Sequence, residues 1–339
     1  MKLRKVVTVS VLVILGVACA GALMAIYTDY SVKASALSLP DALNNIPSDY
    51  QFVFGLNVTN LVQSTAYSKF RQNNPIKGDI ESFTEKTGLD PMRDVSYVLG
   101  AGRSKPNSRN EGVVIVVGKF NQDAITSYIR SKSNPVEFEY NGASILIIPD
   151  PKSDVVKSGI AFLDAREIAM GELEALKAIL DTRGSAGKSI LSNAAIAPLI
   201  DEVSSESMIW FAGDASGVLT NAPATMPGLP FGNGTIAIPN LPSIKNFSGK
   251  ININDAVTGK ITATAFNADA ATKLAEAMKG LIAFGQLAGG SKQPELRTLL
   301  DGLIVSQDTT RVSVVLNLPV DALNKLGKTS QSRRKSTFY

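Results

Sequence analysis

Apolar side chains along residues 48–327 recur with two periods, one of two residues and one near 3.6. Alternating patterns and short apolar runs predict strands, and apolar positions three and four residues apart predict helices. The predicted strands are 51–58, 95–99, 113–117, 136–140, 143–148, 159–163, 167–170, 208–212, 250–255, 260–266, 303–307 and 311–318. The predicted helices are 60–71, 77–87, 121–131, 172–182, 194–203, 268–287, 294–301 and one beginning at Pro319. Hairpins and runs of strands predict an α+β fold of antiparallel sheets packed with helices.

The clearest local signal is a hairpin within residues 136–148. Apolar residues alternate with Glu137 and Glu139, and a second apolar run follows Asn141-Gly142. Asn-Gly favours the positive φ angles of a two-residue type I′ turn. By contrast, the continuous apolar run 113–117 predicts a central strand covered on both faces.

The body contains two similar halves. Phe120-Asn121 and Phe266-Asn267 each close a predicted strand and open a predicted helix, where Asn is a favourable cap. The order of strands and helices around both sites suggests a duplication. We therefore expect two pseudo-repeated lobes, 48–204 and 205–327, followed by a basic disordered tail, 328–339.

The N-terminal region has the pattern of a membrane anchor. Val6 to Ile26 is a charge-free run that spans about 31 Å as a helix, close to the hydrocarbon thickness of a bilayer. Lys2, Arg4 and Lys5 precede it and predict a cytoplasmic N-terminus. The sequence thus predicts a cytoplasmic segment 1–5, one transmembrane helix 6–26, a tether 27–47, and a body outside the cytoplasm.

Two other interpretations of this region remain open. Residues 34–36, Ala-Ser-Ala, match a signal-peptide cleavage site, which would release the body into the periplasm. Cys19 would be the modified residue of a lipoprotein. The long apolar run favours the uncleaved anchor, because cleavable signals usually have a shorter apolar core.

Composition excludes much of the usual catalytic repertoire. The chain of 339 residues is 45% hydrophobic and 19% charged, with one Cys and no His. It therefore lacks Ser-His-Asp and Cys-His catalysis, His metal ligands and an internal disulfide. An exported body of this size without a disulfide suits a bacterial envelope. We predict no enzymatic activity and no cofactor.

The charge distribution argues against a nucleic-acid partner. The formal charge of +4 arises from the two ends of the chain. Residues 31–327 carry 27 basic and 29 acidic side chains, a formal charge of −2. A nucleic-acid-binding domain needs a basic surface to neutralise phosphates.

The short motifs that resemble catalytic or nucleotide sites are incomplete. Gly184–Ser189 resembles the end of a phosphate loop, but it follows a helix and Thr182 replaces the first glycine. We expect Gly184 to end the helix in a left-handed cap. Gly100-Ala101-Gly102 is followed by loop residues, which predicts a hairpin loop.

Two serines could serve a hydrolase without His. Ser185 and Lys188 match an S-x-x-K pattern whose other two elements are missing. Ser216 follows the strand 208–212, but one place late for a nucleophile elbow. There we expect a turn with Asp214 as a helix cap. A Ser-Lys hydrolase remains the enzymatic alternative.

The segment 221–246 combines five prolines and three glycines with large apolar residues, so we expect little regular structure in it. Ordinary flexible linkers are poor in such residues. One interpretation is a contact loop for a partner, lipid surface or ligand, and the other is a loop packed on its own domain. The candidate contact residues are Met226, Leu229, Phe231, Ile236, Ile238 and Leu241.

Two segments resemble a known group of proteins. SLPDALNNIPSDYQFVFGLNV and FTEKTGLDPMRDVSYVLGAGRS are similar to segments of uncharacterised bacterial envelope proteins with one N-terminal apolar helix and an α+β exported body. The resemblance covers most of residues 37–327 and implies no catalytic residue, since the group has no assigned activity.

These observations predict a non-enzymatic structural or interaction module of the bacterial envelope, anchored in the inner membrane with its body in the periplasm or outside the cell. Its partners would be the membrane and an envelope protein. The alternative is a binding protein for a lipid or other apolar ligand held between sheet and helices. A large apolar cavity would favour ligand binding, and a filled core with an exposed apolar patch would favour the module.

Overall fold

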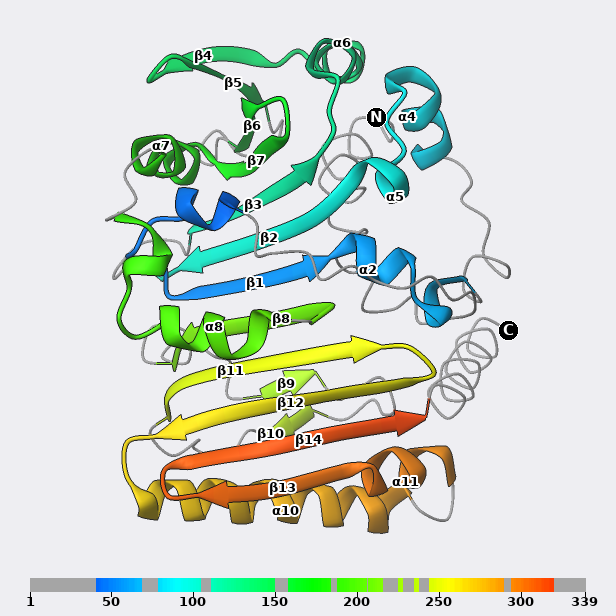
Figure 1. Ribbon diagram of the computed structural model, residues 1–339, viewed down its shortest axis with the longest axis vertical. Coiled ribbons are helices and arrows are strands. Elements are labelled where there is room, and N and C mark those ends of the chain that lie inside the picture. Colours follow the sequence, from blue (N-terminus) through cyan, green and yellow to red (C-terminus); the bar gives the residue numbers. More distant parts are fainter. Residues whose placement is uncertain are drawn as a thin grey trace. The chain divides into compact units, whose positions relative to one another are not determined.

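The computed structural model describes residues 41–68, 79–104, 111–149, 158–183, 188–205, 207–215, 225–227, 235–237, 244–289 and 294–319. The chain divides into two compact units, Met1–Phe211 and Ala212–Tyr339 (Figure 1). The pattern of strands and helices in both units confirms the α+β class with antiparallel sheets.

The first unit is built on a long sheet. Its strands run in the order β8-β1-β2-β3-β7-β6-β5-β4, and the pairings from β1 to β4 are antiparallel. The strands are β1 (Phe52–Asn57), β2 (Val95–Arg103), β3 (Glu111–Gly118), β4 (Val136–Tyr140), β5 (Ala143–Ile148), β6 (Ser158–Asp164), β7 (Glu167–Glu172) and β8 (Ile209–Asp214). The helices are η1 (Asp41–Asn45), α2 (Val58–Val62), α4 (Asp79–Thr87), α5 (Pro91–Asp94), α6 (Gln122–Lys132), α7 (Leu173–Thr182), η3 (Ile190–Ser192) and α8 (Ala197–Ser204).

β3 lies between β2 and β7 and is buried on both faces, as its apolar run predicts. Val116 belongs to a core cluster that includes Phe83 of α4 and Ile129 of α6. Its neighbour Ile115 is also fully buried, because successive side chains of a strand point to opposite faces.

The second unit contains a four-stranded antiparallel sheet in the order β13-β14-β12-β11. Leu274 of α10 packs with Ala265 and Val312 in its core. A separate two-stranded pair joins β9 to β10. The elements are β9 (Thr225–Pro227), β10 (Thr235–Ala237), β11 (Ile244–Ile253), β12 (Ala256–Ala265), α10 (Ala268–Gly289), α11 (Pro294–Asp301), β13 (Leu303–Asp308) and β14 (Arg311–Pro319).

Local sequence signals account for several boundaries. Asn141 and Gly142 both have positive φ, 48° and 75°, which confirms the predicted turn. The side-chain oxygen of Asn121 accepts a hydrogen bond from Ala124 N at 3.0 Å, and that of Asn267 accepts one from Ala270 N at 2.8 Å. Both predicted helix caps are therefore confirmed.

The described part of the predicted tether is packed structure. Residues 41–45 form η1, and Leu43 and Ile46 are fully buried. Ile190 N donates to Ile46 O at 2.7 Å, so long-range contacts fix this segment. The prediction that ordered structure starts near Ser48 was wrong, because two buried apolar residues tie the preceding turn to the core.

Two predicted loops are parts of strands. Gly100-Ala101-Gly102 lies inside β2 and pairs with β1 and β3, so the predicted hairpin loop was wrong. Gly100 leaves room for the ring of Phe54 on the neighbouring strand. Gly213 and Asp214 continue β8, although a turn was predicted there.

None of the helices in the described ranges is long and apolar enough to cross a bilayer. The predicted anchor 6–26 and tail 328–339 lie outside those ranges. So does the helix predicted from Pro319, except that Pro319 itself ends β14.

Candidate functional site

The structure brings two of the six predicted contact residues together. Met226 in β9 is the register partner of Ile236 in β10. Two strands of three residues thus form in a segment expected to have little regular structure, and β-branched residues favour them. The other four residues, Leu229, Phe231, Ile238 and Leu241, lie outside the described residues. The contact loop stays a prediction.

A different apolar surface emerges on the C-terminal half of α10. Leu281, Phe284 and Leu287 are 45%, 70% and 82% exposed. Residues three apart lie on one side of a helix, so these side chains form a continuous row, here called the α10 strip. Large exposed apolar side chains in a row mark a contact surface more often than isolated ones do.

Leu274, Met278, Leu281 and Ile282 have helical spacing in the sequence, but they do not share one environment. Leu274 is buried and Met278 packs against the core, whereas Leu281 is exposed. The reason is that residues 280–289 are apolar on nearly all sides of the helix, so spacing alone cannot choose the buried face.

The N-terminal half of the same helix presents polar groups to water. Asp269, Thr272, Lys273 and Glu276 are exposed, and Lys273 Nζ lies 2.7 Å from an Asp269 carboxylate oxygen. No charged residue occurs in the sequence from Gly280 to Ser291. The outward surface of α10 thus changes from charged to apolar along its length.

α11 holds the apolar half of α10 in place (Figure 1). Gly285 faces Leu300 so closely that a Cβ there would lie 2.8 Å from a Leu300 methyl. Beside this contact, Gln286 Nε2 donates to Asp301 Oδ1 at 2.8 Å. Gly280, in contrast, has open space where a Cβ would stand. The strip is therefore a fixed surface that remains exposed among the described residues.

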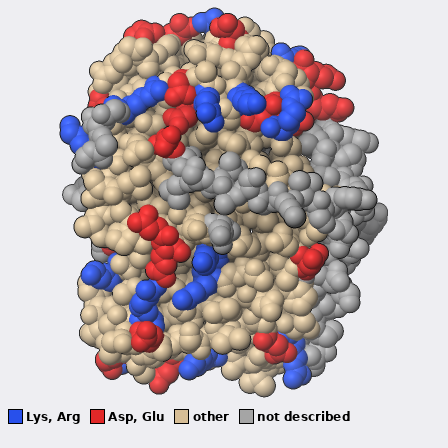
Figure 2. Space-filling view, in the orientation of Figure 1, with Lys and Arg blue, Asp and Glu red and all other residues tan. Residues whose placement is uncertain are grey.

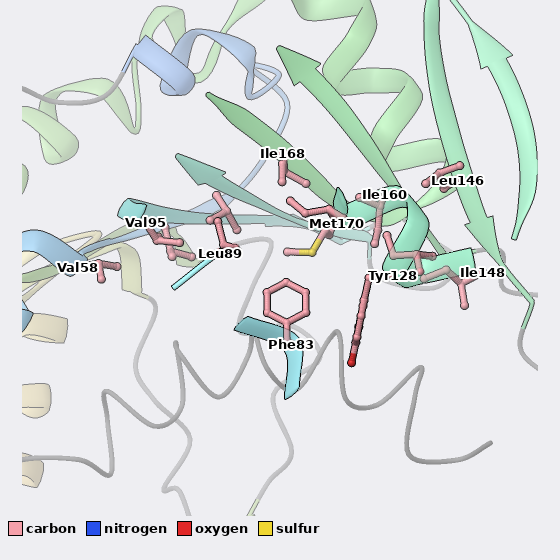
Figure 3. Close-up of a cluster of buried hydrophobic side chains, with 14 of the residues drawn as sticks. Val58, Phe83, Leu89, Val95, Tyr128, Leu146, Ile148, Ile160, Ile168 and Met170 are labelled. Carbon is pink, nitrogen blue, oxygen red and sulfur yellow. The ribbon is translucent and has the colours of Figure 1, made fainter. Parts of the chain in front are cut away.

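The first unit contains a small apolar cavity where α4 and α6 pack on the sheet. It holds about 30 Å³ and is lined by apolar side chains that include Phe83, Phe120, Ile168 and Met170. Met170 points toward the Phe83 ring in Figure 3. This ring also meets Tyr128 edge-on at 5.1 Å between centroids. A space of this size is close to that of one water molecule and far below ordinary ligand pockets of about 300–1,000 Å³.

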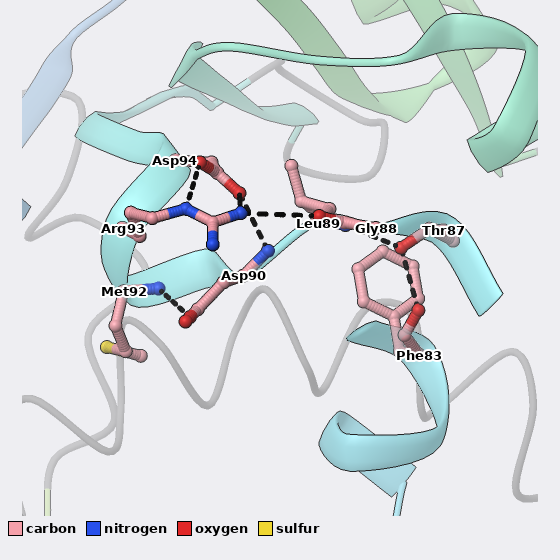
Figure 4. Close-up of polar contacts among 8 residues, drawn as sticks. All are labelled: Phe83, Thr87, Gly88, Leu89, Asp90, Met92, Arg93 and Asp94. Carbon is pink, nitrogen blue, oxygen red and sulfur yellow. Dashed lines mark hydrogen bonds and ion pairs between the residues drawn. The ribbon is translucent and has the colours of Figure 1, made fainter. Parts of the chain in front are cut away.

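The turn that follows α4 lies beside this cavity, because Phe83 and Leu89 both line it (Figure 4). Asp90 caps α5 by accepting from Met92 N at 3.0 Å. Asp94 accepts from Asp90 N and from Arg93 at 2.8 Å. The Arg93 hydrogen bonds and the Asp90 N–H lower the pKa of Asp94. These polar groups are satisfied inside the turn, so their chemistry is structural.

The charged groups around Arg103 are also paired with one another. Arg103 forms ion pairs with Glu111, at 2.7 Å, and with Asp49. Its guanidinium lies 5.1 Å from the centre of the Tyr50 ring. The Tyr50 hydroxyl is buried without a hydrogen-bond partner among the described residues, and burial raises the pKa of Tyr50. Because Arg103 is paired with two carboxylates, we assign this network a structural role.

The described residues offer little conventional chemistry. No group of three or more metal-ligating side chains occurs among them. Gly184, Ser185 and Ser216 lie outside them, so the predicted cap and both serine hypotheses stay open. On the face shown in Figure 2, Lys and Arg side chains lie among Asp and Glu side chains instead of forming a basic patch.

The chain matches no protein-family model and no curated protein. Among solved structures it is similar to crystal form I of TP0453, with a TM-score of 0.43 and 10% identity over 86% of this chain and 98% of that chain. It is also similar to crystal form IV of TP0453, with a TM-score of 0.40 and 9% identity over 87% of this chain and 97% of that one. Neither similarity is close enough to assign an activity.

Proposed function

We propose that this protein is a membrane-anchored, non-enzymatic interaction module of the bacterial envelope. Residues 6–26 would hold it in the inner membrane, with the body in the periplasm or outside the cell. The observation that carries the proposal is the α10 strip, where Phe284 and Leu287 are mostly exposed on a fixed helix. Burying a Leu or Phe side chain completely contributes about 1.5–3 kcal/mol, so such a row favours contact with another apolar surface.

The contrast between the strip and the cavity supports a surface function. A ligand carrier needs an enclosed space that matches its ligand, whereas the described cavity holds about 30 Å³. A lipid chain would fit only if α4 and α6 moved away from the sheet. Binding of an apolar ligand therefore ranks second, and the Ser-Lys hydrolase third.

The finer architecture is part of this proposal. Both units contain a strand that ends just before an Asn-capped helix, at Asn121 and Asn267. We propose that the two lobes arose by duplication. The α10 strip would then be a specialisation of the second lobe, because α6 is shorter than α10 and buries its apolar residues Ile125 and Ile129.

Hydroxyl-radical footprinting of the full chain in its native membranes tests the proposal. Leu281, Phe284 and Leu287 should be oxidised much less than their exposure predicts. Val136, 58% exposed on β4 in the first unit, provides an apolar comparison. Oxidation of the strip in proportion to its exposure, as at Val136, would contradict a contact function. Protease treatment of spheroplasts tests location, since the body should be cleaved while a cytoplasmic marker survives.

A further inference from the structure

We infer that the α10 strip docks on the lipid surface of the membrane that holds the anchor. This inference rests on the proposed membrane anchoring and names what covers the strip. Its occupant is the interfacial region of the bilayer, where apolar side chains meet acyl chains and headgroups.

The size of the surface argues for lipid over a second protein. Three side chains, each partly exposed, form a row along one side of one helix. A stable protein interface usually removes about 1,200–2,000 Å² from water, which needs some 20–30 residues on each side. The described surface around the strip becomes charged at Lys279 and Glu276 instead of extending the apolar row. A narrow row suits an interfacial helix, which needs no complementary shape.

The rest of the chain supplies the missing affinity. Residues 27–40 separate the predicted membrane helix from Asp41 and reach at most about 50 Å when fully extended. A body tied this closely to a bilayer meets lipid at a high effective concentration, so a weak contact becomes sufficient.

The charge pattern of α10 fits the same occupant. The sequence from Gly280 to Ser291 carries no charge, and the exposed Lys279 directly precedes it. A lysine at the end of an apolar stretch attracts anionic headgroups, by about 1 kcal/mol per charge near the surface. On the other half of the outward side, the Lys273–Asp269 ion pair and Glu276 favour water. The helix therefore has one half suited to lipid and one suited to solvent.

Site-specific fluorescence in liposomes tests this inference. Cys19 is the only cysteine, so Cys19→Ser gives a background for single labels. Leu287→Cys places an environment-sensitive nitrobenzoxadiazole label on the strip, and Glu276→Cys places it on the polar half as a matched control. The full-length variants are reconstituted, with no other protein, in equal parts phosphatidylcholine and phosphatidylglycerol. Spin-labelled lipid added to the bilayer quenches only a label that contacts it.

We expect severalfold stronger quenching at position 287 than at 276, and loss of that difference in Leu281→Ser with Phe284→Ser. Equal, weak quenching at both positions would overturn the inference. Shielding at 287 without lipid quenching, increasing with protein density, would also overturn it and indicate a second copy.

A label on Cys19 in the otherwise unchanged chain separates the two proposals. Quenching at Cys19 together with an unquenched strip would refute lipid docking and leave the anchor intact. An unquenched Cys19 would instead refute the anchoring on which the proposed function rests.

Discussion

The indole N–H of Trp210 in β8 donates a hydrogen bond to the buried hydroxyl of Tyr97 in β2. Gly55 of β1 lies between these strands in the sheet order, and a Cβ at Gly55 would collide with the indole ring. Two features thus fix the position of the only tryptophan of the chain: Gly55 leaves room for its ring, and Tyr97 accepts its hydrogen bond.

Gly55→Ala should therefore destabilise the first unit. Overpacking of a filled core typically costs about 1–3 kcal/mol, and the indole that the new Cβ would meet is fully buried. Urea unfolding followed by Trp210 fluorescence measures the loss. Gly280→Ala is the matched control, because open space at Gly280 lets Ala gain up to about 1 kcal/mol in helix propensity. Equal destabilisation by both variants would contradict this packing.

The two buried tyrosines should respond differently to loss of their hydroxyl groups. Tyr97→Phe leaves the Trp210 N–H unpaired and should cost about 1–3 kcal/mol. Tyr50→Phe removes a hydroxyl that has no partner among the described residues and should be neutral or stabilising. Chemical denaturation of both variants at neutral pH measures the difference. A larger loss for Tyr50→Phe would contradict the hydrogen-bond assignment.

Tyr97 should also make the first unit sensitive to alkali. Burial raises the pKa of Tyr97 to about 12. The unfolded state loses this proton near pH 10, before the folded state does, so the stabilising contribution is full below that pH and is lost as pH rises towards 12. Tyr97→Phe should reduce the fall of the unfolding free energy between pH 10 and 12. Part of this fall should remain, because the pKa of Tyr50 is also raised by burial. An unchanged slope would show that Tyr97 is not buried as a neutral group.

Glu167→Gln should stabilise the first unit at neutral pH. Burial, followed by the nearby Asp164 carboxylate, raises the pKa of Glu167, although Asn45 Nδ2 donates to it at 2.7 Å. A carboxyl with a raised folded pKa binds its proton more tightly in the folded state, so its contribution to stability increases as pH falls through that pKa. The advantage of Gln should therefore shrink on acidification. An advantage that grows as pH falls would contradict this assignment, and melting curves across the acidic range would reveal it.

The turn at Asp94 has the opposite pH dependence. Its lowered pKa means that the ionised carboxylate stabilises the fold above the unfolded pKa, and that this contribution is lost as pH falls through the folded pKa. Asp94→Asn should cost about 1 kcal/mol or more, because one amide must replace a carboxylate that accepts from Asp90 N and Arg93. Arg93→Ala should cost less, since Arg93 is largely exposed. A greater loss for Arg93→Ala would reverse the assigned roles.

Fluorophosphonate labelling tests the absence of hydrolase activity. The full chain should give no specific adduct at Ser185 or Ser216, because neither sequence pattern is complete. Mass spectrometry of tryptic peptides identifies the labelled residue. An adduct at either serine that disappears in the matching Ser→Ala variant would replace the interaction module with an enzyme.

The sequence was most informative where the controlling contacts are local. Asn141-Gly142 determines its own turn through backbone φ, and Asn121 and Asn267 cap helices three residues away. Gly100 was wrongly assigned to a loop. A glycine is needed there because the ring of Phe54, on another strand, occupies the space of a side chain. A glycine that makes room for a distant side chain looks identical, in sequence, to one that makes a turn.

The α10 strip was not predicted, because it too depends on contacts between distant parts of the sequence. Exposure of Phe284 and Leu287 depends on which side of α10 meets the sheet and α11, and an apolar run gives no preference. The contact of Gly285 with Leu300 fixes that choice. One signal was present in the sequence: a helix that is apolar on both sides needs a second covering surface.

The outermost strand of the first sheet bears on how densely this protein can be concentrated. β4 pairs only with β5 in the described sheet, and its outer edge could recruit the same edge of another molecule. Glu139 is exposed along it and Glu137 forms an ion pair with Arg130, so pairing of two such edges would bring Glu139 charges together and cover an ion pair. We therefore expect many copies in one membrane to stay separate. The charged edge of β4 opposes edge-to-edge pairing, and the exposed apolar surface lies on a helix instead of on this strand.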